Sequence, residues 1–172
     1  ALRIAYTSNP YPAPKKSQAM SAPDHDLAVL FADIAGSTSL YERIGNAAAL
    51  AAISRCLEMA AETAKGHGGR LVKTIGDEAL LLFSTADDAV EAAGEIQRRM
   101  ADSAGGNDLR LGFRIGLHHG AAIESSGDVF GDAVNVAARM VGLAKRGQVI
   151  LSQATMGRLA PSLAARVREL DR

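Results

Sequence analysis

The most constraining feature of this sequence is a pair of apolar runs joined by only two residues. The runs are RLVKTI (70–75) and EALLLF (78–83), with Gly76-Asp77 between them. Two strand-like runs with so short a link predict a β-hairpin with Gly76-Asp77 at its bend. Lys73 stands four positions before Asp77, so a cation and a carboxylate lie near the bend, where neither can join a core. A solvated turn would explain both residues taken alone.

The bulk composition fits one globular domain without a general attraction to polyanions. The chain has 172 residues, 48% of them hydrophobic, and nineteen basic residues balance nineteen acidic ones. A chain with no net charge has no overall field that would draw nucleic acid or an anionic membrane. No apolar run approaches the roughly 20 residues that a membrane span needs. We therefore expect neither nucleic acid nor a membrane contact for this chain. The single cysteine, Cys56, excludes an internal disulfide and suits the reducing cytoplasm.

Composition divides the chain near residue 26. Residues 1–26 hold four of the five prolines, which predicts a linker or arm. Residues 27–172 predict the element order β-α-β-β-α-β, followed by further strands and helices. That order is typical of an α/β (α+β) fold with a ferredoxin-like palm core, and we expect one domain over residues 27–172.

Periodicity and chain-breaking residues predict the individual elements. Apolar runs predict strands over 27–36 and 148–152, and one long strand or two over 109–123, broken near Gly120. Helical spacing predicts a short and a longer helix separated at Gly45-Asn46, followed by an amphipathic helix over 86–101. It predicts a further helix capped by Asp132 and stopped by Gly147. A last, short helix is predicted to be capped by Ser152 and to end before Pro161.

The predicted topology brings Asp33 and Asp77 together. The loop after the first palm strand lies beside the bend of the central hairpin. Two carboxylates so placed repel each other unless a cation lies between them, and Mg²⁺ combines few carboxylates with water and phosphate oxygens. Backbone N–H groups in the adjoining run Gly36, Ser37 and Thr38 can turn toward a phosphate. These features favour two-metal nucleotide chemistry. The alternative is that Asp33 caps a helix and Asp77 occupies a turn.

Four segments resemble, in order and spacing, the motifs of class III nucleotidyl cyclases. They are FADIAGST, VKTIGDEAL, FRIGLHHG and GDVFGDAVNVAAR, and the resemblance covers about residues 27 to 160. It implies two Mg²⁺ ions per site, with Mn²⁺ as an alternative, held by Asp33, Asp77 and the backbone carbonyl of Ile34. It also implies that the ribose 3′-hydroxyl of a nucleoside triphosphate attacks the α-phosphorus in line and that pyrophosphate leaves.

The resemblance assigns substrate contacts to three further charged residues. Lys73 and Asp128 match the pair that selects adenine, since a lysine can donate to N1 and an aspartate can accept from the 6-amino group. Guanine reverses both requirements. Taken singly, each could be an ordinary strand-end or turn residue. Arg114 matches an arginine near the terminal phosphates, although a structural carboxylate could equally be its partner.

Asn135 and Arg139 are four positions apart on a predicted helix and therefore share a face. In the family, the matching asparagine orients the ribose and the matching arginine stabilises charge at the α-phosphate. The alternative is a solvent-facing stripe. Adjacent strand residues point to opposite faces, so we interpret His118 and His119 as structural rather than as joint metal ligands.

We therefore predict a cytoplasmic adenylyl cyclase that converts ATP to 3′,5′-cyclic AMP and pyrophosphate as a homodimer. In the family, the metal-binding carboxylates of one subunit face the adenine-selecting pair and the Asn135 helix of the other. We expect a regulatory domain elsewhere in the full-length chain. We also expect that the family's C-terminal hairpin is absent, because the chain stops at RVRELDR (166–172). The alternatives are a guanylyl or diguanylate cyclase and a non-catalytic nucleotide-binding or dimerisation module.

Overall fold

The computed structural model describes residues 3–8, 25–104 and 109–170. Its strands are β1 (Arg3–Thr7), β2 (His25–Ala35), β3 (Arg70–Ile75), β4 (Glu78–Phe83), β5 (Gly112–Ser125), β6 (Asp128–Phe130), β7 (Gln148–Ser152) and β8 (Arg168–Glu169). Its helices are α1 (Ser37–Ile44), α2 (Asn46–Gly66), α3 (Ala86–Ala104), α4 (Asp132–Leu143), α5 (Gln153–Met156) and α6 (Pro161–Ala164). From β2 to β5 this is the predicted βαββαβ core, and the additions follow it.

A mixed eight-stranded sheet forms the centre of the fold. Its strand order is β3-β4-β2-β5-β7-β1-β8, and β6 pairs with the far end of β5. The central strand β2 runs antiparallel to both β4 and β5, whereas β7 runs parallel to β5. In this register Asp33 lies opposite Glu78 on β4 and opposite Arg114 on β5. The end of β2 therefore lies beside the bend of the β3–β4 hairpin, as the palm topology predicts.

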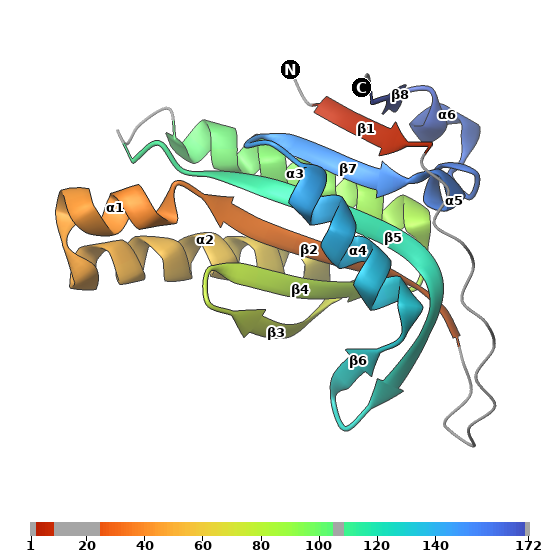
Figure 1. Ribbon diagram of the computed structural model, residues 1–172, viewed down its shortest axis with the longest axis horizontal. Helices are drawn as coiled ribbons and strands as arrows, with labels where there is room; N and C mark the ends of the chain where they lie inside the picture. The colour runs from red at the N-terminus through yellow and green to blue at the C-terminus, as the bar shows by residue number, and fades with distance from the viewer. Residues whose placement is uncertain (1–2, 9–24, 105–108, 171–172) are drawn as a thin grey trace.

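Helices cover the two faces of the sheet unequally (Figure 1). Helices α2 and α3 cover one face, and α4 crosses the other. Side chains along β2 alternate between the two faces of the sheet and so contribute to the core on both sides. Leu30 and Ile34 belong to the core cluster shared with α2 and α3, whereas Val29 and Phe31 belong to the cluster shared with α4. Asp33 has the parity of Val29 and Phe31, so its side chain lies on the α4 face.

Helix α4 packs closely on the sheet because β5 has a glycine beneath it. A Cβ atom at Gly116 would lie 1.9 Å from the backbone nitrogen of Val141 and 2.7 Å from the carbonyl oxygen of Ala137. Any side chain at this position would push the helix away. Gly116 thus sets the height of α4, and with it the height of Asn135 and Arg139, above the sheet.

The predicted linker over residues 1–26 is wrong for residues Arg3–Thr7. They form β1, which pairs in parallel with β7 along its whole length and with β8 on its other side. Ile4 and Ala5 are buried there. Burial of these apolar side chains and pairing with the edge of β7 therefore outweigh the proline-rich context. Residues 9–24 of the predicted arm lie outside the described residues.

Several helix boundaries differ from those predicted. Asp132 is the first residue of α4 rather than its cap, and Gly131 occupies the cap position without a side-chain hydrogen bond. The same helix ends at Leu143, before Gly147. Pro161 begins the additional helix α6, because proline fits a first turn, where its missing N–H costs nothing.

Other boundary predictions are confirmed. Gly45 separates α1 from α2, and Ser152 caps α5 by accepting a hydrogen bond from the Thr155 N–H. Strand β5 runs through Gly120 as one strand, which answers the question that the sequence left open. Among the described residues, no helix is both long and apolar enough to cross a membrane.

Candidate active site

Asp33 and Asp77 meet where three segments converge. The backbone N–H of Ile34 donates to the carbonyl oxygen of Asp77 at 3.1 Å. Ser37, the first residue of α1, donates its hydroxyl to Asp77 Oδ2. The end of β2, the hairpin bend and the start of α1 therefore form one unit, so Asp33 and Asp77 come from adjoining segments, as the topology predicts.

A third carboxylate, Glu78, adds to the negative charge at this point. Glu78 is half-buried, and burial raises its pKa. Asp33 and Asp77 raise that pKa further, whereas Arg114 lowers it. A negative potential of this kind favours a bound cation. Glu78 was not predicted as a site residue, although its position next to Asp77 in the GDE run was a signal for it.

Arg114 forms an ion pair with Asp33. Its Nε atom lies 2.7 Å from Asp33 Oδ2, and its Nη2 atom donates to the same oxygen. The Asp33 side chain is only 13% exposed, whereas that of Arg114 is 43% exposed. The anionic partner that the apolar strand required for Arg114 is therefore Asp33 in this structure. The guanidinium lies directly at the carboxylate cluster.

A hollow of about 690 Å³ adjoins Asp77 and the start of α1. Ser37, Thr38, Thr74 and Gly76 contribute to its lining. This volume is within the range of small-molecule sites, and the N–H groups at a helix start attract anions. Gly36 makes the entry to the helix possible because its φ of 93° is a conformation that other residues rarely adopt. The predicted phosphate-binding segment thus borders an open space beside Asp77.

Lys73 and Asp128 are brought together from distant parts of the chain. Lys73 Nζ on β3 lies 2.6 Å from Asp128 Oδ2 on β6. The other oxygen of Asp128 accepts the Val129 N–H at 2.8 Å. The hydrogen bond from Lys73 is the main cause that lowers the pKa of Asp128, and the Val129 N–H lowers it too. A second ion pair, which was not predicted from the sequence, joins Arg70 on β3 to Glu124 on β5.

The structure places Asn135 and Arg139 together on the exposed face of α4. Ala133, Ala137 and Met140 are buried on its other side. The shared face predicted for the pair is present. Exposure of both polar side chains fits a solvent-facing stripe as well as a site that a second chain completes.

The two adjacent histidines have separate structural contacts. His118 Nδ1 lies 2.6 Å from Ser152 Oγ, and the backbone N–H of His119 donates to Thr155 Oγ1 at 2.8 Å. Burial lowers the pKa of both rings. These contacts join β5 to the start of α5 and agree with a structural role.

The donor set at the carboxylates is small. Within residues 3–8, 25–104 and 109–170, no group of three or more His, Cys, Asp or Glu side chains is arranged to hold a metal ion. Mg²⁺ often binds through one or two carboxylates and fills its shell with water and substrate phosphates. Asp33, Asp77 and the Ile34 carbonyl are hard oxygen donors of this type and remain the candidate ligands.

Comparison with known proteins identifies the class. The family model of the adenylate and guanylate cyclase catalytic domain matches residues 20–171. This match covers most of the chain and includes every candidate residue described above. The chain belongs to the class III nucleotidyl cyclases, as a catalytic domain of that family.

Individual relatives agree with this assignment. An adenylate cyclase of Streptomyces coelicolor is 35% identical over 131 residues, which cover 76% of this chain and 33% of the relative. An adenylate/guanylate cyclase/hydrolase structure from Silicibacter pomeroyi has a TM-score of 0.68 at 33% identity and covers 79% of this chain and 80% of that chain. The catalytic core of a rhodopsin-guanylyl cyclase with converted specificity, in complex with ATPαS, has a TM-score of 0.72 at 28% identity over 80% of this chain and 83% of that chain. This chain spans about a third of the length of the Streptomyces relative.

Proposed function

We propose that this chain is the catalytic domain of an adenylyl cyclase that converts ATP to 3′,5′-cyclic AMP and pyrophosphate. The observation that carries the choice of ATP is the contact between Lys73 and Asp128, which sets an ammonium donor beside a carboxylate acceptor. Adenine offers an acceptor at N1 and a donor at its 6-amino group, whereas guanine offers the reverse. The adenylate cyclase of Streptomyces coelicolor supports the same substrate.

We propose that two divalent cations bind at the carboxylate cluster. Asp33, Asp77 and the Ile34 carbonyl would hold Mg²⁺ or Mn²⁺, and the negative charge that raises the pKa of Glu78 favours cations at this point. When bound, such ions lower the pKa of a coordinated hydroxyl and neutralise phosphate charge. Ser37 would orient Asp77 through the hydrogen bond that it already makes.

The remaining residues of the proposed site bind the nucleotide and stabilise charge. The run Gly36, Ser37 and Thr38 would receive the triphosphate at the start of α1, and Arg114 would contact its terminal phosphates. Asn135 would orient the ribose, and Arg139 would stabilise the charge that develops at the α-phosphate.

In the proposed reaction one phosphorus–oxygen bond replaces another. The 3′-oxygen forms a bond to the α-phosphorus as its proton leaves to solvent, and the bond to the pyrophosphate oxygen breaks. Pyrophosphate is thus the leaving group of an in-line substitution.

We propose that two copies of the chain build two equivalent sites. Large apolar side chains are exposed on the elements that carry the candidate residues: Ile75 and Phe130 are each 52% exposed, and Leu143 is 47% exposed. Exposed apolar groups of this kind gather at interfaces. Across a two-fold axis, Asp33 and Asp77 of one subunit would face the other subunit's Lys73, Asp128, Asn135 and Arg139.

We also propose a cytoplasmic location and a regulatory region in the whole protein. A cytoplasmic location suits the free Cys56 thiol and an ATP substrate. The match covers only 33% of the Streptomyces coelicolor relative, so that protein has a further region, and a regulatory region in the whole protein agrees with this.

Product analysis tests the proposed activity. The purified chain is incubated with ATP or GTP in the presence of Mg²⁺ or Mn²⁺, and products are separated by chromatography and identified by mass. We expect cyclic AMP and pyrophosphate from ATP, at an efficiency at least roughly tenfold above that for GTP. Asp77→Ala is the inactive control. Cyclic GMP or a cyclic dinucleotide as the main product would identify another cyclase, and nucleotide binding without turnover would identify a non-catalytic module.

A further inference from the structure

A second hollow, of about 320 Å³, is lined mainly by residues of α2 and α3. These two helices lie on the face of the sheet opposite α4 (Figure 1). We call this hollow the α2–α3 groove. Most of its lining is apolar and includes Ala52, Met59, Met100 and Leu111. Arg55 and Arg99 line it as well, and its described lining residues include no Asp or Glu. The volume is at the lower end of the range for small-molecule sites.

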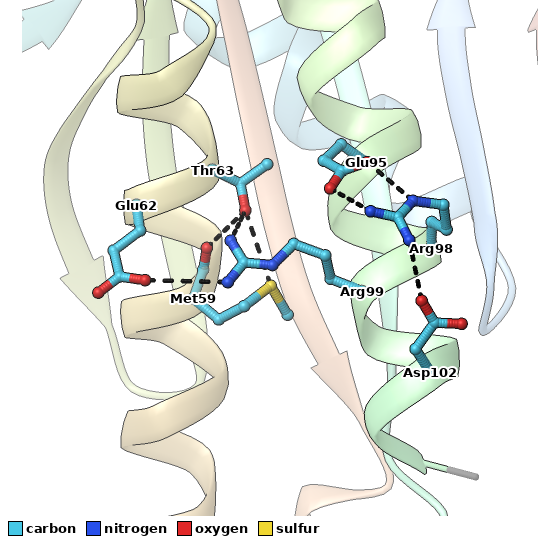
Figure 2. A network of polar contacts seen from close by, with 7 residues as sticks. All are labelled: Met59, Glu62, Thr63, Glu95, Arg98, Arg99 and Asp102. Atoms are coloured by element: carbon cyan, nitrogen blue, oxygen red, sulfur yellow. Dashed lines mark hydrogen bonds and ion pairs between the residues drawn. The ribbon is translucent and has the colours of Figure 1, made fainter.

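Arg99 holds its positive charge at this groove. Figure 2 shows its guanidinium between the two helices. Its Nη1 atom donates to Thr63 Oγ1 at 2.7 Å, and its carboxylate contact, Glu62, is 3.9 Å away and 74% exposed. The Thr63 hydroxyl donates in turn to the Met59 carbonyl oxygen at 2.8 Å. A neutral hydroxyl and a distant, solvated carboxylate compensate the charge only in part.

The neighbouring Arg98 is a contrasting case on the same helix. It pairs with Glu95 at 2.6 Å and with Asp102 at 2.9 Å, along the side of α3 (Figure 2). Arg98 does not line the α2–α3 groove. The two adjacent arginines therefore differ: Arg98 has two close carboxylates, whereas Arg99 lines a groove whose described residues include none.

The apolar part of the groove can adapt to an occupant. Cys56, Met59 and Met100 supply its sulfur atoms. Methionine side chains are flexible and polarisable, so they adjust to apolar ligands of varied shape. An apolar wall beside two cations matches a molecule with an apolar chain and one negative group.

We propose that the α2–α3 groove binds a medium-chain carboxylate from solution, with the apolar chain against the methionines and the carboxylate against Arg55 and Arg99. The charge and the apolar lining together determine this ligand class: the cations require the anionic group, and the wall requires the chain. This proposal does not depend on the chain's proposed activity.

The groove also adjoins the segment that supports the start of α1. Leu109 and Leu111 line the groove, and Arg43 on α1 donates to the Leu109 carbonyl oxygen at 3.2 Å. A Cβ atom at Gly36 would lie 3.1 Å from the Arg110 carbonyl oxygen. A ligand in the groove thus touches residues that pack directly beneath the candidate phosphate-binding segment.

Cys56 makes occupancy directly measurable because it is the sole cysteine of the chain and lines the groove. The rate of alkylation by iodoacetamide, an uncharged reagent, is measured with decanoate below its micelle concentration. Occupancy should slow the reaction at least about fivefold at saturation. Butyrate, which has the charge without the chain, and decanol, which has the chain without the charge, should each slow it less than about twofold.

Matched variants test the role of the cations. Arg55→Gln with Arg99→Gln should abolish the protection by decanoate, whereas Arg98→Gln should keep it. Arg55 is exposed, so the single Arg55→Gln variant retains the fold and should weaken protection even if the double variant unfolds. Equal protection by decanol and decanoate, protection in Arg55→Gln that is as strong as in the unaltered chain, or no protection in the unaltered chain would overturn the proposal. Labelling that slows with protein concentration alone would also overturn it, since a second copy would then fill the groove.

Discussion

Lys73 Nζ lies 2.6 Å from Asp128 Oδ2, although the two residues are 55 positions apart. This contact joins the β3–β4 hairpin to β6, so donor and acceptor are held side by side before any base is present. A base that binds between them must replace their mutual hydrogen bond with its own donor and acceptor. A mismatched base leaves both groups without a partner.

Exchanging the two charges should therefore change the preferred nucleotide. In Lys73→Glu with Asp128→Lys the ion pair is kept, but the positions of donor and acceptor are reversed to match guanine. We expect kcat/KM for ATP to fall by roughly tenfold or more and the ratio of GTP to ATP turnover to rise. Each single variant should lose ATP turnover without gaining GTP turnover. An unchanged ratio in the double variant would mean that the pair does not read the base.

The hydrogen bond from Ser37 to Asp77 should matter for metal binding. In Ser37→Ala, Asp77 loses the donor that orients its carboxylate. We expect the Mg²⁺ concentration for half-maximal activity to rise by about tenfold. Ser39→Ala is the matched control, because Ser39 is on the same helix but donates to the Gly36 carbonyl oxygen at 3.1 Å. Equal shifts in the two variants would contradict a specific role for Ser37.

Two glycines near α4 should respond to alanine in opposite directions. Gly116→Ala would set a Cβ 1.9 Å from the Val141 nitrogen, so we expect a loss of about 1–3 kcal/mol in the free energy of unfolding. Activity should fall as well, since α4 carries Asn135 and Arg139. Gly142→Ala meets no atom within 4 Å, and alanine in a helix should add about 0.5–1 kcal/mol. Urea denaturation measures both, and stability retained in Gly116→Ala would show that α4 is not held by this contact.

The buried histidines should make the fold less stable in acid. Burial lowers the pKa of His118 and His119 below the ordinary value for histidine, so these side chains bind protons more readily in the unfolded chain. The free energy of unfolding is therefore highest, with respect to these two groups, above about pH 6.5. It falls as the pH drops from there through the lowered pKa values of the folded state. Glu78, whose pKa is raised, acts in the opposite direction, so a comparison of variants is needed.

Urea denaturation at pH 7.5 and 5.5 makes that comparison. The loss of unfolding free energy between the two pH values should be smaller in His118→Gln with His119→Gln than in the unaltered chain. His25→Gln, at an exposed position at the start of β2, should show the full loss. A double variant that loses as much as the unaltered chain would assign the acid sensitivity to other groups.

Local patterns in the sequence predicted the palm core, and long-range pairing explains what they did not predict. The β3–β4 hairpin follows from two apolar runs and a two-residue link. Strand β1 offers only RIAYT beside a proline-rich stretch, and its partner β7 begins at Gln148. Nothing local indicates a pairing over that distance. Pro161 ended a helical pattern in the sequence, but a proline at the first turn of the next helix has the same local signature.

The candidate site shows the same division. The neighbourhood of Asp33 and Asp77, and that of Lys73 and Asp128, followed from topology and from the family motifs. The ion pair of Arg114 with Asp33 did not, because an arginine in an apolar strand requires an anion without specifying which one. The contribution of Glu78 depends on its half-buried position on β4, which a GDE run alone does not reveal.

A mixture of two inactive variants tests the composite site most directly. Asp77→Ala removes a proposed metal ligand, and Arg139→Ala removes the proposed transition-state contact of the other subunit. With random pairing, half of the dimers are mixed and each has one intact site, so the mixture should recover about a quarter of the wild-type cyclic AMP production. Differently tagged chains establish that mixed dimers form. Activity that stays at the level of the separate variants, although mixed dimers are present, would contradict a site shared between two chains.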